Sequence, residues 1–113
     1  MILGVHSATF VKNWYEDVTP YIHKCKKAGY KSVEVSLLGQ TPSSVKDISK
    51  LAKDLNITLT CTTGLSKEED ISSGDSDIQK NGIEALKRAI DMTSIMEAKL
   101  LTGVVHAAWG ISN

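Results

Sequence analysis

The chain has 113 residues, 42% of them hydrophobic, and its 13 basic and 13 acidic side chains give a formal net charge of zero. This profile is that of an ordinary soluble globular domain, and a balanced charge gives no electrostatic reason to expect nucleic acid as a partner. No run of residues approaches the roughly 20 consecutive apolar positions needed to cross a bilayer. We therefore expect no nucleic acid and no membrane among the partners.

The compartment is inferred from the N-terminus and the cysteines. Residues 1–6 lack the basic region, long apolar run and cleavage site of a secretory signal peptide. Cys25 and Cys61 have unrelated spacing, which favours two reduced, buried thiols over one disulfide. The sequence therefore predicts a cytoplasmic protein.

Short strands alternate with amphipathic helices from the start of the chain. An apolar run over residues 2–6 predicts the first strand, and apolar residues at helical spacing over residues 15–28 predict the first helix. Gly29 can end that helix, because glycine accepts the left-handed conformation of many helix ends. Residues 32–37 are rich in β-branched side chains and predict the second strand.

The same order continues after the second strand. Thr41 suits the cap of a second helix and Pro42 its first position, while Asn56 is the expected stop. Residues 57–61 predict the third strand, and a polar loop is expected over residues 62–74.

The last predicted elements are a third helix and a fourth strand. Asp75 or Ser76 is the expected helix cap. The predicted apolar face of the helix consists of Ile78, Gly82, Ile83, Leu86, Ile90, Thr93 and Met96. Residues 99–105 are predicted to form the fourth strand.

Alternation of strands with helical segments predicts parallel strands joined by right-handed crossovers. Two architectures fit, an open doubly wound sheet or part of a (βα)8 barrel. The turn after the first strand has no Gly-x-Gly-x-x-Gly, and no Walker-type lysine motif is present, which weakens the nucleotide-binding form of the open sheet. Residues 1–113 are expected to form one domain or part of one.

Candidate functional residues follow the predicted strands, because the carboxyl-end loops of parallel sheets build the site. Trp14 and Trp109 both lie on such loops. They could form an apolar wall for the carbon face of a sugar; the alternative is that each covers the end of the core.

Among the polar residues, His6 ends the first strand and could be a hydrogen-bond donor, a base, a metal ligand or a structural residue. His106 carries the same alternatives, and His23 is expected on the surface. Glu34 is charged within an apolar strand and is expected to be paired, in support of a site.

Other reactive side chains give weaker signals. The acidic run over residues 68–70 is interpreted as solvated surface, and Cys61 as an inert thiol because no basic residue is near it in sequence. No metal-binding motif stands out. Taken alone, these residues support the wall of a small-molecule pocket.

Six blocks, in order and in spacing, carry a family resemblance over the whole chain. They are residues 4–7 with Trp14, 28–35, 59–65, 71–75, 82–91 and 103–109. Together they resemble the N-terminal part of the ketose 3-epimerases, the D-tagatose/D-psicose (allulose) 3-epimerase group of the xylose-isomerase-like TIM-barrel family. The resemblance implies the N-terminal half of a (βα)8 barrel, with four parallel strands and three helices, truncated before the remaining strands.

The resemblance also implies a chemistry. Family members hold a ketose on a divalent metal ion (Mn, Mg or Co) and exchange its C3 proton through two glutamates. These groups lie on the fifth to eighth strands, and this sequence ends at Asn113. We therefore expect this chain to contain no catalytic residue and no metal ligand, and to be inactive alone.

What the resemblance assigns to this chain is the pocket wall. His6 stands where family members commonly have an aromatic residue, and the two tryptophans match ones that contact the C4–C6 end of the sugar. The predicted substrate-binding residues are His6, Trp14, Thr62, Gly64, Val104 and Trp109.

A half-barrel would leave an unpaired strand edge and an inner sheet face without its opposing half. We expect that inner face to be apolar, and the chain to associate with itself or with a complementing C-terminal half. Two alternatives to the epimerase remain. One is a non-catalytic module that binds sugar or self-associates; the other is a different enzyme of the superfamily, such as an endonuclease-type or inosose-dehydratase-type barrel.

Overall fold

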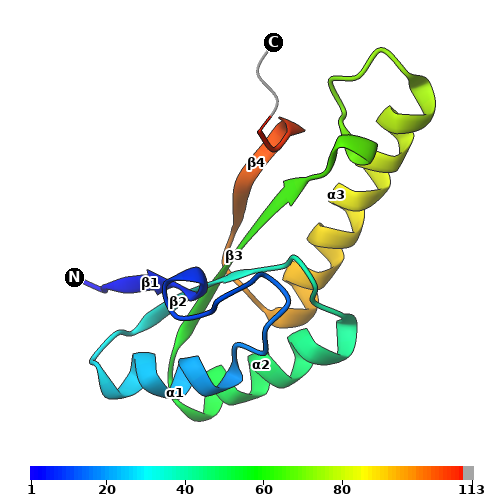
Figure 1. Cartoon of the computed structure of the whole chain (residues 1–113). Helices are drawn as coiled ribbons and strands as arrows, with labels where there is room; N and C mark the ends of the chain where they lie inside the picture. The colour runs from blue at the N-terminus through cyan, green and yellow to red at the C-terminus, as the bar shows by residue number, and fades with distance from the viewer. Residues whose placement is uncertain (111–113) are drawn as a thin grey trace.

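The computed structural model describes residues 1–110 and contains strands and helices in alternation (Figure 1). The strands are β1 (Gly4–His6), β2 (Ser32–Ser36), β3 (Thr58–Leu65) and β4 (Leu101–Ala108). The helices are α1 (Thr19–Lys27), α2 (Pro42–Asp54) and α3 (Ser76–Met96), with short 3-10 turns η1 (Ser7–Thr9) and η2 (Lys67–Glu69). The predicted order of elements is confirmed.

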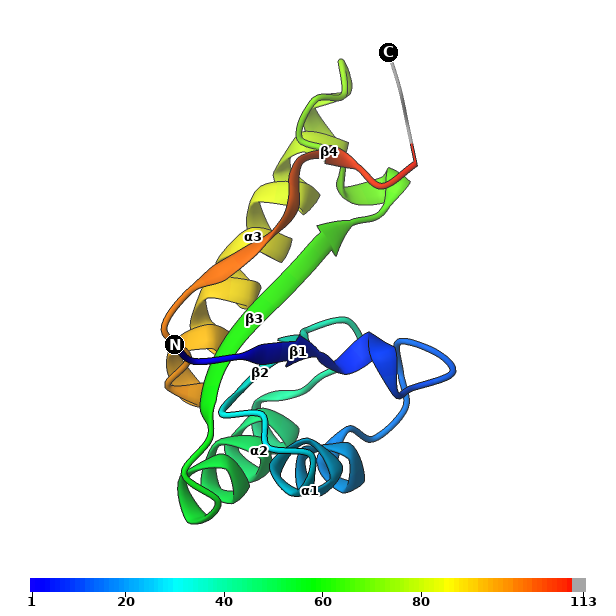
Figure 2. The ribbon, with the colours of Figure 1, turned by 90° about the vertical axis from the view of Figure 1, so that its left-hand side faces the viewer.

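The four strands form one parallel sheet in the order β1-β2-β3-β4. The helices lie on one side of this twisted sheet and leave its other face uncovered (Figures 1 and 2). The strand ends that carry the candidate residues therefore meet at one edge, as expected for parallel strands.

The core lies between the sheet and the helices. It contains the almost fully buried side chains of Val33 and Val35 of β2, Cys61 of β3, Ile22 of α1 and Ile48 of α2. Alternate residues of a strand point to opposite faces, so these side chains fix which face of the sheet meets the helices.

The uncovered face of the sheet is polar, and the expectation of an apolar inner face is wrong. Glu34 of β2 pairs in register with His6 of β1 and with Thr60 of β3, and Thr62 pairs with Thr102 of β4. These residues keep contact with solvent, none of them being fully buried. Hydroxyl-bearing side chains tolerate water, so this face needs no apolar cover.

Local sequence signals account for the helix ends. The Thr41 hydroxyl accepts a hydrogen bond from the Ser44 N–H, and the Ser44 hydroxyl accepts one from the Thr41 N–H, which completes a capping box ahead of α2. Asp75 caps α3 through the N–H groups of Asp77 and Ile78. Both caps were predicted from the sequence.

Several predicted boundaries are wrong. Helix α1 begins at Thr19, because Asp17 binds the Thr19 N–H and holds the preceding segment in a turn. Strand β3 continues to Leu65, since the expected loop pairs with β4 as a strand. Strand β4 runs over Leu101–Ala108. Within residues 1–110, no helix combines the length and the apolar character needed to span a membrane.

The predicted apolar face of α3 is correct only in part. Gly82 and Met96 are buried, but Ile83 and Ile90 are 48% and 59% exposed. Ala89, which was not predicted, takes the buried position between Gly82 and Met96.

Candidate functional site

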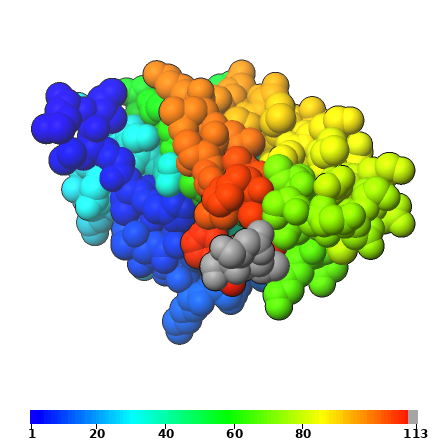
Figure 3. Space-filling model, turned by 90° about the horizontal axis from the view of Figure 1, so that it is seen from above, coloured from blue at the N-terminus to red at the C-terminus, as the bar shows by residue number. Residues whose placement is uncertain are grey.

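A cavity of about 410 Å³ opens at the carboxyl ends of the strands. All of the residues predicted to bind substrate lie around it: His6, Trp14, Thr62, Gly64, Val104 and Trp109. Figure 3 looks down on this end of the molecule, where the end of β4 lies between the N-terminal loops and the β3–α3 segment. The fold thus brings together residues up to about a hundred positions apart in sequence.

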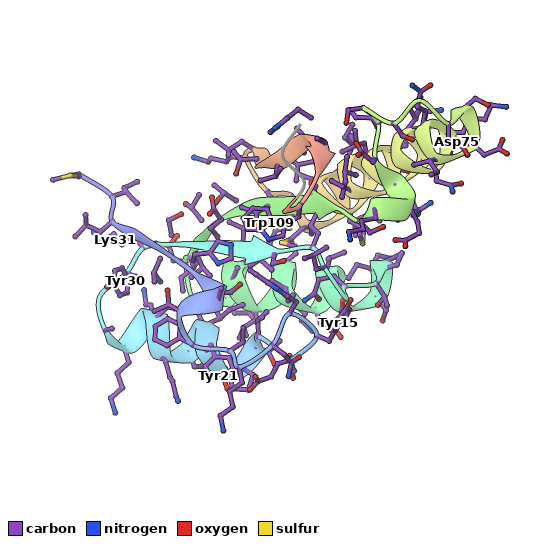
Figure 4. All side chains as sticks on the ribbon, turned by 45° about the horizontal axis from the view of Figure 1, so that its top comes forward. Tyr15, Tyr21, Tyr30, Lys31, Asp75 and Trp109 are labelled. Atoms are coloured by element: carbon purple, nitrogen blue, oxygen red, sulfur yellow. The ribbon has the colours of Figure 1, made fainter. Side chains whose placement is uncertain are left out.

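Aromatic rings form the outer wall of the cavity. Trp14 is 47% exposed and Trp109 is 72% exposed, so neither ring covers the core. Tyr15, which the sequence did not single out, also lines the cavity; Figure 4 labels it beside the β1–α1 loop, with Trp109 at the end of β4. Large exposed apolar rings around a cavity are typical of a surface that a ligand covers.

Trp109 is placed by an irregularity in the sheet. Gly64 pairs with Val104, but the next residue of β3, Leu65, pairs with Ala108, so β4 bulges between these positions. The Trp109 N–H then donates to the Leu65 carbonyl at 2.9 Å. The bulge therefore sets where Trp109 stands at the rim.

Gly64 of β3 and Val104 of β4 pair with each other and both line the cavity. A Cβ atom at Gly64 would have no neighbour within 4 Å, so this glycine faces open space. Val104 is half-buried beside it. Small side chains at these two positions keep the cavity wide.

The polar end of the cavity is built around His6. Its Nε2 lies 3.0 Å from the Thr62 hydroxyl oxygen, and its Nδ1 accepts a hydrogen bond from the Ala8 N–H at 2.9 Å. Glu34 lies 3.9 Å from Nε2 and accepts a hydrogen bond from the Thr60 hydroxyl. The expected supporting role of Glu34 agrees with these contacts. A smaller polar hollow of about 200 Å³ lies on the other side of His6.

Asp70 is a residue that the sequence reading missed, and its assignment to solvated surface is wrong. It is only 8% exposed and accepts hydrogen bonds from the Ser72 hydroxyl and N–H, at 2.6 and 2.9 Å. The pKa of the Asp70 carboxyl is lowered, most of all by the hydrogen bond from the Ser72 hydroxyl. The N–H groups of Ser72 and Ala108 and the nearby His106 lower it further. Asp70 thus holds the turn over Ser72 and Ser73, close to the end of β4. The Asp-x-Ser spacing, typical of a turn, is the signal that could have found it.

The remaining candidates take no part in the cavity. His23 and His106 are exposed, and His106 lies outside the lining. Cys25 and Cys61 are free and buried, as predicted. Burial raises the pKa of the Cys61 thiol to about 11, which agrees with an inert thiol.

The described residues do not fit a metal centre. Between Met1 and Gly110, no three histidine, cysteine, aspartate or glutamate side chains come together. His6 and Glu34 alone are fewer ligands than a protein metal site ordinarily supplies.

Comparisons with known proteins agree with the fold and the site. No family model matches the chain. D-psicose 3-epimerase of Agrobacterium fabrum is 27% identical over 111 residues, which cover 96% of this chain and 38% of that protein. The chain therefore spans less than two fifths of the length of this relative.

Solved structures show the same relation. The crystal structure of a D-psicose 3-epimerase in the presence of D-fructose matches 99% of this chain and 40% of its own, with a TM-score of 0.90 and 27% identity. The enzyme of Clostridium cellulolyticum H10, solved with D-tagatose, matches with a TM-score of 0.88. The sheet with its helices thus has the fold of the N-terminal part of a TIM barrel, and the chain is similar over nearly its whole length to the N-terminal part of the D-psicose 3-epimerases.

Proposed function

We propose that this chain forms part of the substrate pocket of a ketose 3-epimerase, an isomerase that inverts C3 of a ketose. The observation that carries the proposal is the single cavity on which all of the predicted pocket residues converge. The similarity to D-psicose 3-epimerases over 96% of the chain supports the same reading.

In this proposal the chain binds and orients the sugar. Trp14 and Trp109 offer their rings to the carbon-bound hydrogens of a ketose, while Thr62 stands at the polar end of the cavity. Among residues 1–110, no carboxylate lines the cavity. We propose that residues outside this chain supply the acid–base pair that exchanges the C3 proton, together with any divalent metal. The chain alone is then inactive. Two unpaired cysteines support a cytoplasmic location.

Replacing Trp109 with alanine is expected to weaken the binding of D-psicose about tenfold, because the largest exposed ring at the rim is lost. Titration calorimetry with the unmodified chain and the variant measures the change. Leu100→Ala is the matched control, since Leu100 is an exposed apolar residue outside the cavity. Equal binding of D-psicose by all three proteins, or no binding by any, would contradict the proposal.

A second candidate is a half-barrel that covers its exposed apolar side chains with another protein chain. The observation that favours it is the pair Ile83 and Ile90, exposed two helical turns apart on α3, with exposed Val105 on β4. We propose a second copy of this chain, or a complementing C-terminal half, as the cover. Sedimentation is expected to show a dimer or larger species at micromolar concentration; a monomer at all concentrations would rule out the second copy.

A further inference from the structure

His6 has no ring nitrogen left for a ligand. The Ala8 N–H points at Nδ1 from 2.9 Å, and an N–H can donate only to a nitrogen that carries a lone pair. Nδ1 of the neutral ring is therefore the acceptor, and the ring proton sits on Nε2. Since Nε2 lies 3.0 Å from the Thr62 hydroxyl oxygen, His6 donates and Thr62 accepts.

The surroundings of the ring favour the same arrangement. The Glu34 carboxylate lies on the Nε2 side, at 3.9 Å, and its negative charge attracts a proton on that nitrogen. The Thr60 hydroxyl, 3.4 Å from the other carboxylate oxygen, holds Glu34 in this direction. The Trp14 ring meets the imidazole edge-on, with ring centres 6.2 Å apart and planes at 88°. The ring thus has partners on three sides.

This arrangement fixes what Thr62 can do. A hydroxyl has one proton to donate and lone pairs to accept with, and a lone pair of Thr62 is taken by His6. Its own proton is left over, and among the hydrogen bonds of residues 1–110 none takes it. Thr62 lines the cavity and is only half-buried. Its hydroxyl is therefore free to donate into the cavity.

We propose that His6 is a positioning residue, and that the Thr62 hydroxyl, held by it, is the hydrogen-bond donor that selects an acceptor oxygen of the ligand. This inference rests on the proposed function, because the acceptor it names is a hydroxyl or carbonyl oxygen of a ketose. It differs from the expectation that His6 itself contacts the sugar. The histidine acts through the threonine.

The tautomer of His6 is the first test and needs no sugar. In chain labelled with ¹⁵N-histidine, long-range ¹H–¹⁵N spectra at neutral pH distinguish the two ring nitrogens. His6→Gln identifies the His6 signals against those of His23 and His106. We expect the proton on Nε2 and a lone pair on Nδ1. A proton on Nδ1 overturns the proposal, whatever the protein binds.

The second test uses two variants that each keep one of the two hydrogen-bonding functions of the imidazole. His6→Gln can place an amide N–H near the position of Nε2, whereas His6→Asn keeps an acceptor near Nδ1 and loses the donor to Thr62. We expect His6→Asn and Thr62→Val each to weaken D-psicose binding about tenfold, and the double variant no further. His6→Gln and Thr62→Ser should stay within about twofold of the unmodified chain.

Additive losses in the double variant, or an equal loss in His6→Gln and His6→Asn, would overturn the proposal. Urea unfolding of each variant separates a binding loss from a folding loss. If the unmodified chain binds no D-psicose, the proposed function fails, and the tautomer measurement still decides whether His6 holds Thr62 in this way.

Discussion

Replacing Gly103 with alanine is expected to lower the free energy of unfolding by about 3 kcal/mol. Gly103 has a φ of +126°, a backbone conformation that side-chain-bearing residues avoid. A Cβ atom there would also lie 2.0 Å from the Thr63 carbonyl oxygen, which is backbone and has little freedom to move away. Backbone strain and steric overlap therefore both arise at Gly103, which pairs with Thr63 of β3.

Gly64→Ala is the matched control for this prediction. Gly64 lies on the neighbouring strand and lines the same cavity, but its Cβ would meet nothing within 4 Å. We expect a change of less than about 0.5 kcal/mol in its free energy of unfolding. Urea unfolding followed by circular dichroism measures both variants. A Gly103→Ala chain as stable as Gly64→Ala would show that β4 does not need this glycine.

The order of the elements could be predicted because local residues set it. Thr41 and Asp75 cap their helices through bonds made within a few residues, so the sequence alone determines them. The boundaries of β3 could not be predicted in this way. Residues 62–65 read as a polar loop, and only their pairing with β4, some 40 positions later, makes them a strand.

Helical periodicity predicts which residues share a face, but not which face meets the sheet. On α3 the larger isoleucines were expected inside, yet Ile83 and Ile90 are exposed while Gly82 and Ala89 are buried. The reason is a close approach. The carbonyl of Glu69 lies against Gly82, where only a residue without a side chain fits, and this contact sets the rotation of the helix.

For the site, the sequence and its family resemblance predicted which residues surround the cavity, but not how they act. His6 obtains one partner two residues away and another 56 residues away, and the two together decide its tautomer. Asp70 was taken for surface because it follows two other acidic residues. The Asp-x-Ser spacing marks the turn at Asp70, but the burial of its side chain depends on where the loop packs, which the local spacing does not reveal.

Replacing Gly82 with valine is expected to lower the free energy of unfolding by about 2 kcal/mol. Inside a helix, valine in place of glycine ordinarily gains a few tenths of a kcal/mol. Here the Cβ would lie 2.2 Å from the Glu69 carbonyl oxygen and 2.6 Å from a methyl group of Ile71. Overpacking of this kind costs about 1–3 kcal/mol, so the overlap outweighs the gain in helix propensity.

The Gly82→Val substitution should also change the environment of Trp109 at the rim of the cavity. Only Ser66 separates η2 (residues 67–69) from Leu65, and the Leu65 carbonyl accepts a hydrogen bond from the Trp109 N–H. A displaced η2 therefore loosens Trp109, whose emission can be followed alone in a Trp14→Phe background because the chain has two tryptophans. Gly74→Val is the control, since a Cβ there meets nothing within 4 Å. If Gly82→Val loses stability but the Trp109 emission is unchanged, the packing of η2 on α3 and the position of Trp109 are independent. If Gly82→Val and Gly74→Val are equally stable, the close contact of the Glu69 carbonyl with Gly82 is not needed for the fold.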